Sequence, residues 1–321
     1  MPTIPELAQR QRKEIADADA ANLEALSRAY SLMYDNMQGD IDALMLAIEK
    51  LDNPTSAEIK ALPQYKRLLR KAESELDRFG VYLETIVGTS ALAAIGLGLA
   101  HSEALVNLAL GGGFTGLDTG AMRQLLNFLR KDGPLYARLK LITDSTIDKV
   151  VKSILDGVAS GFNPRVIASN IQDAFGGGLT DALRNTRTVQ IYSYRESARA
   201  NYISSGVVDS WIWWAELDAD TCEACWAEHG NIYPLDETLS GHYNCRCAPL
   251  PYIEGLTEQP ERGEDLFNNL SETEQRSIMG DTKYEAYQAG KFQFGDMVRR
   301  NENEVYGQMV GVVPLKDLLG E

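Results

Sequence analysis

The feature that most constrains this chain is the placement of its soft metal ligands. All four cysteines and two of the three histidines of its 321 residues lie in the stretch DADTCEACWAEHGNIYPLDETLSGHYNCRC. Cys222 and Cys225 have the spacing at which two thiolates of one tight turn face a single ion. His242 and Cys245 repeat that offset, and Cys247 lies on the same side as Cys245 if its segment is extended. The spacing predicts a loop between two strands that a metal clamp closes.

Five candidate ligands serve the four positions of a tetrahedral site, so two ligand sets stay open. One set takes both paired turns, and in the other set Cys247 replaces His242. His229 is a weaker candidate, because it sits inside the loop rather than in a paired turn. A structural zinc ion is the favoured interpretation.

Three other chemistries compete with structural zinc. Disulfides suit small secreted frameworks, whereas this chain is large and its first twenty residues do not read as an export signal. A redox Cys-x-x-Cys pair is expected within a βαβ pattern, which is missing around this motif. A catalytic zinc needs a nearby base, for which Glu223, Glu228 and Asp236 are available, but acidic residues are common throughout the chain.

The N-terminal half predicts long helices. Apolar residues at intervals of three and four predict one helical face, ended by Asn53-Pro54, and a second helix capped by Ser56 repeats the pattern as far as Ile86. The residues of the first face are Leu23, Leu26, Tyr30, Met33, Met37, Ile41, Leu44, Ile48 and Leu51. The two helices form a bundle core or, alternatively, a surface for self-association.

Further helices are expected along the middle of the chain. The apolar stretch 89–112 is interrupted by polar residues, which favours a buried helix or helical hairpin over a membrane span. Helices are also predicted at 121–131 and 135–157. Asn163 and Pro164 open a short helix that the glycines at 176–178 are expected to close.

After another helix at 180–204, the pattern becomes that of a strand. VVDSWIWWAEL is aromatic and β-branched, with Trp211 and Trp213 on one face and Ile212 and Trp214 on the other. The fold class is therefore α+β, mainly α. We expect an N-terminal helical region at 1–135, a domain with the Cys/His motif at 136–253, and a C-terminal tail of short helices at 254–321.

The net charge of −15 argues against a surface that coats nucleic acid, because neutralising phosphates needs clustered Lys and Arg. The one basic stretch is the helix carrying Arg184, Arg187, Arg195 and Arg199. A solvated helix face explains it, and a binding strip for phosphate or an acidic partner is the alternative.

The residues from about 140 to 253 resemble the Mu protein F-like minor head proteins of tailed bacteriophages, also called phage head morphogenesis proteins. The resemblance rests on YRESARANYISSGV, then WIWWAELDADTCEACWAEHGNIYPL, then GHYNCRCAPLP, in that order. The tail, with Gln275 and Gly280, is also similar. Asp220 and Gly241 stand where members commonly have Arg and Pro, whereas the cysteine and histidine framework is intact.

The resemblance implies a structural, non-enzymatic component of the prohead, present in the host cytoplasm before assembly. Its partners would be the portal, scaffold or major capsid protein, and any DNA contact would be weak. The competing hypothesis is a metal-dependent or ADP-ribosyltransferase-like phage enzyme, since such domains are sometimes joined to this family. The sequence offers no Gly-rich phosphate loop and no His-Glu-x-x-His helix in support of an enzyme.

Overall fold

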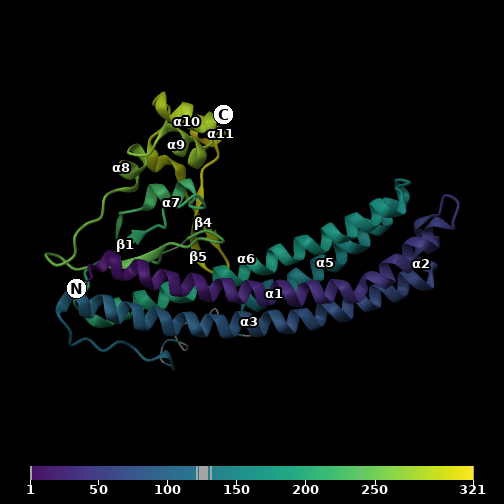
Figure 1. Cartoon of the computed structure of the whole chain (residues 1–321), viewed down its shortest axis with the longest axis horizontal. Helices are drawn as coiled ribbons and strands as arrows, with labels where there is room; N and C mark the ends of the chain where they lie inside the picture. Colours follow the sequence, from purple (N-terminus) through teal and green to yellow (C-terminus); the bar gives the residue numbers. More distant parts are fainter. Residues whose placement is uncertain (1, 121, 123–128, 131, 240, 321) are drawn as a thin grey trace. The chain divides into compact units, whose positions relative to one another are not determined.

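The computed structural model describes residues 2–120, 122, 129–130, 132–239 and 241–320. Long helices dominate the chain, and two small antiparallel sheets lie in its C-terminal third (Figure 1). The predicted α+β, mainly α class is therefore confirmed. The helix predicted at 121–131 falls largely outside the described residues.

Most of the helices described in the first two thirds of the chain are much longer than average protein helices, and the one at residues 56–61 is short. They are α1 (Ile4–Glu49), α2 (Ser56–Ala61), α3 (Pro63–Leu110), α5 (Pro134–Ala159) and α6 (Pro164–Ser205). The remaining elements are β1 (Ser210–Trp214), α7 (Glu223–Glu228), β2 (Ile232–Pro234), β3 (Ala248–Tyr252), α8 (Gly263–Asn268), α9 (Glu272–Met279), α10 (Asp281–Gln288), η2 (Phe294–Met297), β4 (Val298–Asn303), β5 (Gly307–Val312) and α11 (Leu315–Leu319).

The chain forms two compact units assembled from interleaved stretches. One comprises residues 1–17, 91–128 and 188–321, and the other comprises 18–90 and 129–187. We call them the sheet unit and the helical unit. The helices α1, α3 and α6 each contribute to both. The two units are built from interleaved stretches, whereas the sequence predicts three domains that follow one another along the chain. The boundaries of those three domains stay a prediction.

The helical unit contains the apolar face predicted for the first helix, since the side chains from Leu26 to Ile48 in that pattern are buried. The expected start of the second helix is corrected by one residue. Thr55 is the N-cap, and it forms a capping box with Glu58. This short helix ends at Ala61 with Leu62 as its C-cap, and Pro63 then begins α3, because proline suits the first helical position and disfavours a helical residue before it.

The glycines at 176–178 do not end a helix, and α6 runs through them without a break. A Cβ atom on Gly178 would lie 2.4 Å from Thr146 Oγ1 and 2.5 Å from Tyr30 Oη. Glycine is therefore present here because α6 approaches its neighbours closely, and the prediction of two separate helices is wrong for that reason.

Within the described residues, α3 is the one helix long and apolar enough to cross a membrane, and 44% of its most apolar window is buried. Its polar residues have partners in the sheet unit. His101 Nε2 lies 3.0 Å from Glu14 Oε2, and Asn201 donates to Ser102 Oγ at 2.9 Å. These contacts are those of a core helix, as predicted for 89–112, and the segment continues as one helix to Leu110 rather than folding back as a hairpin.

In the sheet unit, β1 is the central strand of a three-stranded antiparallel sheet in the order β2-β1-β3. Trp211 and Trp213 pack in one apolar cluster, which also contains cysteine side chains. Ile212 packs in a second cluster with Leu250, and Trp214 borders that cluster. The predicted alternation of the two strand faces is confirmed.

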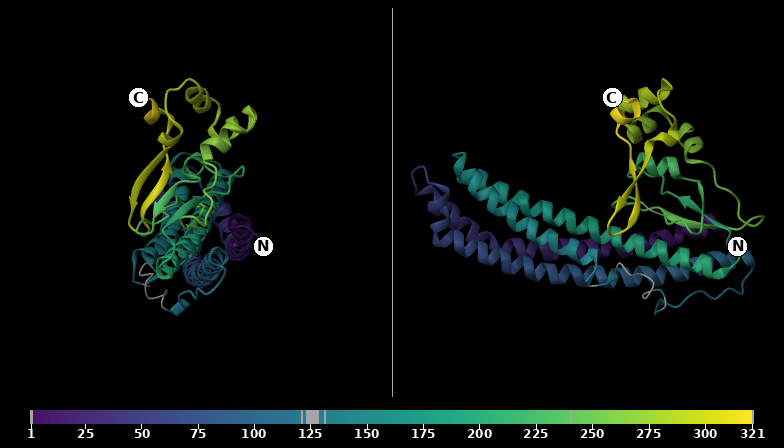
Figure 2. Two further views of the ribbon diagram at one scale, coloured as in Figure 1. Left: turned by 90° about the vertical axis from the view of Figure 1, so that its left-hand side faces the viewer. Right: turned by 180° about the vertical axis from the view of Figure 1, so that it is seen from behind.

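The C-terminal tail contains the predicted short helices and, in addition, a β-hairpin that the sequence analysis did not predict. Figure 2 shows β4 and β5 as a two-stranded ribbon near the C-terminal end of the colour scale. The sequence of β4, VRRNEN, is polar and mostly exposed, so it lacks the apolar alternation by which strands are predicted. The helices α8 to α10 pack around the fully buried Phe267.

Candidate metal centre

The two halves of the Cys/His motif come from a helix start and from a tight turn. Cys222 is the N-cap of α7, and Cys225 lies in the first turn of that helix. His242 and Cys245 are joined by a turn in which the Cys245 amide donates to the His242 carbonyl at 3.0 Å. Cys247 directly precedes β3. Both halves thus adjoin the central sheet.

The structure brings all five predicted ligands together. Cys222 Sγ lies 3.0 Å and Cys225 Sγ 3.3 Å from His242 Nε2, and Cys225 Sγ lies 3.7 Å from Cys245 Sγ. Cys225 belongs to two groups whose ligand atoms lie within 4.8 Å of one another, one with Cys222 and His242 and one with Cys245 and Cys247. The cluster is of the Cys3His type and can hold a metal ion.

The imidazole of His242 is oriented as a metal ligand. Its Nδ1 lies 2.6 Å from the carbonyl oxygen of Tyr243 and donates its proton there. In the neutral form that a metal ion would bind, the lone pair is then on Nε2, the atom that faces Cys222 and Cys225. A backbone carbonyl that fixes the tautomer of a histidine is a common arrangement around protein-bound metals.

The cluster is enclosed. Cys225, Cys245 and Cys247 are buried, whereas Cys222 and His242 are partly buried. All four cysteines are free thiols, which agrees with a ligand cluster and not with a disulfide pair. The cavity beside them has a volume of about 20 Å³. That space is the size of an ion or a single water molecule.

Cys222, Cys245 and the imidazole are shifted toward charged forms, whereas the hydrogen bond with Cys222 raises the pKa of Cys225 and burial raises that of Cys247. A hydrogen bond with Cys225 lowers the pKa of Cys222 to about 5 against the effect of burial. Burial opposes the charging of Cys245, yet hydrogen bonds from Cys225 and Cys247 hold its pKa well below the ordinary value. Burial likewise disfavours the His242 imidazolium, but the hydrogen bond to Cys222 and the thiolate charges raise its pKa to about 9. Buried negative charge of this kind is stabilised by a cation.

Arg195, which the sequence predicts as part of the basic strip, contacts the cysteine turn. Its side chain is 3% exposed and donates from Nε to the Cys247 carbonyl at 2.8 Å. From Nη2 it donates to the carbonyl and to the sulfur of Cys245, at 3.1 and 3.0 Å. The signal in the sequence is weak, because an arginine in a basic helix is typical of a solvated face.

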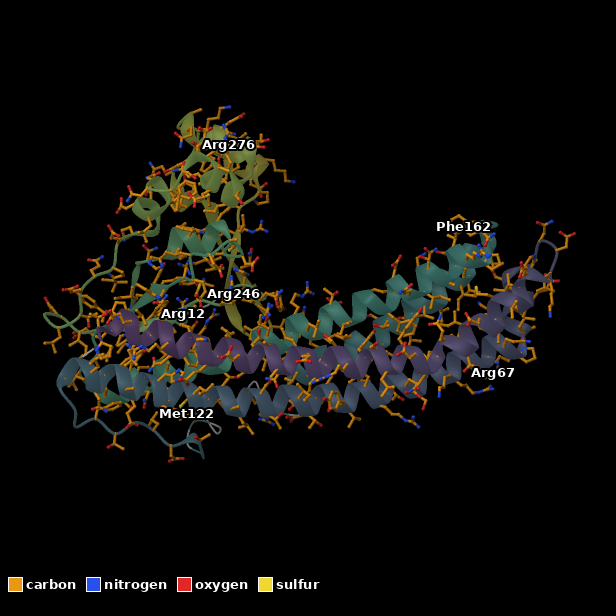
Figure 3. The ribbon with its side chains drawn as sticks, viewed as in Figure 1. Arg12, Arg67, Met122, Phe162, Arg246 and Arg276 are labelled. Atoms are coloured by element: carbon orange, nitrogen blue, oxygen red, sulfur yellow. The ribbon has the colours of Figure 1, made fainter. Side chains whose placement is uncertain are left out.

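Gly241 and Asp220, the two departures from the family pattern, both lie beside the cluster. A Cβ atom on Gly241 would lie 2.5 Å from Arg195 Nη1 and 2.6 Å from Cys245 Sγ, so this site admits no larger residue. The amide of Asp220 donates to Asp218, whose carboxylate pairs with Arg246 at 2.6 Å. Arg246, labelled in Figure 3, donates from Nη1 to Asp218 Oδ2 at 2.6 Å.

The weaker ligand candidate, His229, lies outside the cluster. Its Nδ1 accepts a hydrogen bond from the Ala215 amide at 3.1 Å, and its ring packs on Trp214 with 4.7 Å between centroids. Burial, with the nearby charge of Arg12, lowers its pKa to about 4. This histidine is therefore neutral near pH 7.

Two of the three carboxylates considered as bases for a catalytic zinc form ion pairs, and the third is exposed. Glu223 forms an ion pair with the buried Lys283 of α10. Glu228 is 2% exposed and binds Arg300 of β4 at 2.9 Å. Asp236 is exposed. The two pairs attach the tail to α7.

Two arginines of the predicted basic strip belong to the helical unit. Arg184 donates to Asp181 at 2.7 Å, and Arg187 donates to Asp19 at 2.6 Å. Both guanidinium groups are therefore paired with carboxylates of their own unit.

The other two arginines of the strip belong to the sheet unit. Arg195 binds the cysteine turn, and Arg199 donates to Glu196 and to the Leu235 carbonyl, each at 2.8 Å. All four thus have partners inside the protein, and binding of nucleic acid or an acidic partner by the strip stays a prediction.

Comparison with known proteins adds one finding to this geometry. Residues 148–250 match the family model described as "Phage Mu protein F like protein". Searches of curated proteins and of solved structures gave no match. The matched region contains all of α6, the strands β1 and β2, most of β3 and every candidate ligand of the Cys/His cluster. Residues 148–250 are therefore similar to the Phage Mu protein F-like family.

Proposed function

We propose that this chain is a structural, non-enzymatic component of a phage head that acts near the portal during procapsid assembly and genome packaging or delivery. The observation that carries the proposal is the match of 148–250 to the Mu protein F-like family, with the Cys/His cluster inside it. The proposed location is the prohead and virion, after a stage in the host cytoplasm. The proposed partners are the portal, scaffold or major capsid protein.

Within this function, the cluster binds one structural Zn²⁺. Cys222, Cys225, His242 and Cys245 are connected by the contacts of 3.0 to 3.7 Å between their ligand atoms, and we assign them as the four ligands. Cys247 is the alternative fourth ligand, since it lies near Cys225 and Cys245. The ion would join the start of α7 to the strand β3 and so close the loop between them.

The geometry of the cluster favours structure over catalysis. A catalytic zinc keeps one coordination position open to water or substrate. Here the ligands are buried or partly buried, and the adjoining cavity of about 20 Å³ has no room for a substrate. The metal-dependent enzyme hypothesis is therefore the weaker one.

Contacts with head proteins are also favoured over contacts with DNA. The chain carries a net charge of −15, and the four arginines of its basic helix are engaged by carboxylates or backbone carbonyls. A DNA contact through them would have to break these interactions. Any such contact is expected to be weak and to fall steeply with salt concentration.

The test is co-expression with the portal protein encoded in the same phage genome, followed by affinity capture of this chain. We expect the portal to be captured by the wild type and by Ser74→Ala, an exposed control in α3. Cys222→Ser should lose the zinc and lower capture. Proheads assembled without the chain should be defective. Absence of portal capture together with normal infectious heads would exclude the assembly function.

A further inference from the structure

The sheet unit contains a second cavity, of about 430 Å³, that the proposed metal site does not use. It shares Glu216 with the surroundings of the Cys/His cluster and extends from there toward the start of α1. Its lining includes Arg12, Trp214, His229, Glu258 and Glu261. The volume is within the range of sites that bind small molecules or short peptide segments.

His229 gives this cavity a buried hydrogen-bond donor. The residue is 2% exposed, and its Nδ1 accepts from the Ala215 amide. In the neutral ring the proton is then on Nε2, and this N–H has no hydrogen-bond partner among the described residues. A buried donor at a cavity wall is suited to an acceptor such as a peptide carbonyl oxygen.

Arg12 is a second buried side chain at the wall, and its charge is balanced from within the chain. It is 7% exposed and donates to the carbonyl oxygens of Ala215 and Trp214 at 3.3 and 3.0 Å (Figure 3). Its Nε lies 3.2 Å from Glu216 Oε1, which makes an ion pair, although the angle does not allow a hydrogen bond. The ion pair engages Glu216 alone among the carboxylates of the lining, whose described residues include no lysine and no second arginine.

An acidic segment, residues 258–261, forms the outer wall of the cavity. Backbone contacts of this segment and of Gly263, which follows it, fix its position. The Gly263 amide donates to the His229 carbonyl at 2.9 Å. A Cβ atom on Gly263 would lie 1.8 Å from the Trp226 carbonyl oxygen, and one on Gly230 would lie 2.8 Å from the Glu261 carbonyl oxygen. The wall is therefore packed directly against the His229 backbone, and its two exposed carboxylates, Glu258 and Glu261, stay beside the cavity.

We propose that this cavity binds a basic peptide segment of a partner protein, with a Lys or Arg side chain between Trp214 and the carboxylates of Glu258 and Glu261. The indole of Trp214 is partly exposed and is the best aromatic surface for a cation. The Nε2–H of His229 binds a backbone carbonyl of the same segment. Glu6, at the start of α1, adds a further carboxylate to the lining.

The charges of the lining decide between a basic and an acidic ligand. Four carboxylates line the cavity, at Glu6, Glu216, Glu258 and Glu261, against the single guanidinium of Arg12, and His229 is neutral. The chain as a whole is acidic, so a basic segment is also favoured at long range. This inference goes beyond the proposed head function, because it assigns the binding chemistry of a site that the function does not require.

The experiment uses the full zinc-loaded chain and two fluorescein-labelled peptides, Ac-Gly-Lys-Arg-Lys-Gly-NH2 and Ac-Gly-Glu-Asp-Glu-Gly-NH2, followed by fluorescence anisotropy. We expect the basic peptide to bind and the acidic one not to bind. The double variant Glu258→Gln, Glu261→Gln should weaken binding by about tenfold, from two exposed charge pairs. The matched control is Glu254→Gln, Glu302→Gln, which removes the same charge at exposed positions away from the cavity and should change binding less than about twofold.

Trp214→Leu tests the aromatic contact separately and should weaken binding of the basic peptide by a similar factor. Equal losses in the two double variants would show a general charge effect and would overturn the site. Binding of the acidic peptide in preference, or no binding of the basic one at millimolar concentration, would overturn it as well. Portal capture by the Glu258, Glu261 variant is measured in parallel, so that failure of this site is distinguishable from failure of the head function.

Discussion

The guanidinium of Arg195 donates a hydrogen bond to the sulfur of Cys245 at 3.0 Å. The same side chain binds the carbonyl oxygens of Cys245 and Cys247. Arg195 thus fixes the second half of the metal cluster to α6. The planar fork of an arginine fits two backbone acceptors at once, which the single ammonium group of a lysine does not.

Arg195→Lys should therefore lower the free energy of unfolding by about 2 to 4 kcal/mol, because it keeps the charge but leaves a buried carbonyl without its donor. Urea unfolding of the zinc-loaded protein measures the change. Arg262→Lys is the matched control, since Arg262 is exposed and makes no side-chain cap to α8. A change below about 0.5 kcal/mol in both variants, the size typical of surface substitutions, would contradict the positioning role.

A second pair of variants tests whether Cys245 or Cys247 is a zinc ligand. Cys245→Ser should reduce bound zinc from about one ion per chain to less than one half, because a tetrahedral site loses one of its four ligands. Cys247→Ser should retain the zinc, since Cys247 is outside the proposed set. Elemental analysis of protein purified under reducing conditions without chelator gives the stoichiometry. Zinc loss in the Cys247 variant alone would reverse the assignment, and absence of zinc from the wild type would refute the site.

The two buried tryptophans of β1 provide a comparison within one strand. Both are 1% exposed, but Trp211 Nε1 donates to the Glu237 carbonyl at 3.0 Å, whereas Trp213 Nε1 has no partner among the described residues. Truncation of either to Ala should cost about 3 to 5 kcal/mol. Trp211→Phe should cost about 1 kcal/mol more than Trp213→Phe, because only the first breaks a hydrogen bond. The measurement is the denaturant midpoint of each variant at constant m value. Equal losses of stability in the two Phe variants would mean that the hydrogen bond of Trp211 contributes nothing.

The sequence predicted those features that depend on local periodicity and spacing. The helical stripe that includes Leu26 and Ile48, the alternating faces of the Trp211 strand and the convergence of the Cys/His pairs are all present in the structure. Each follows from the geometry of one or two elements. The family resemblance also agrees with the match at 148–250.

The features that escaped prediction depend on contacts between distant segments. Gly178 reads as a helix end, and only the approach of Tyr30 and Thr146 shows why the helix continues. The β4–β5 hairpin has a polar sequence, and Arg300 in β4 is fixed by Glu228 of α7. Arg195 resembles a solvated residue until the cysteine turn covers it. Tertiary packing of this kind leaves no periodic signal.

The last prediction concerns the pH dependence of stability through His229. Burial lowers its folded-state pKa to about 4 from an ordinary value of 6.5. Because the folded pKa is the lower one, the neutral ring contributes stability that is fully present above pH 6.5 and is lost as the pH falls from 6.5 toward 4. At pH 5 the loss should be about 2 kcal/mol, since the unfolded chain is then protonated and the folded chain is not.

His229→Asn removes this titration while an amide oxygen can still accept from the Ala215 amide. Its stability between pH 7 and pH 5 should fall by about 2 kcal/mol less than that of the wild type. Ile212→Val is the control, because it weakens the core of the same sheet without a titrating group and should keep the slope of the wild type. Urea unfolding at several pH values measures how the free energy of unfolding of each of the three proteins changes with pH. His101 and the metal ligands also titrate, but they contribute the same amount in all three proteins. A slope of the Asn variant equal to that of the wild type would show that the folded-state pKa of His229 is not depressed.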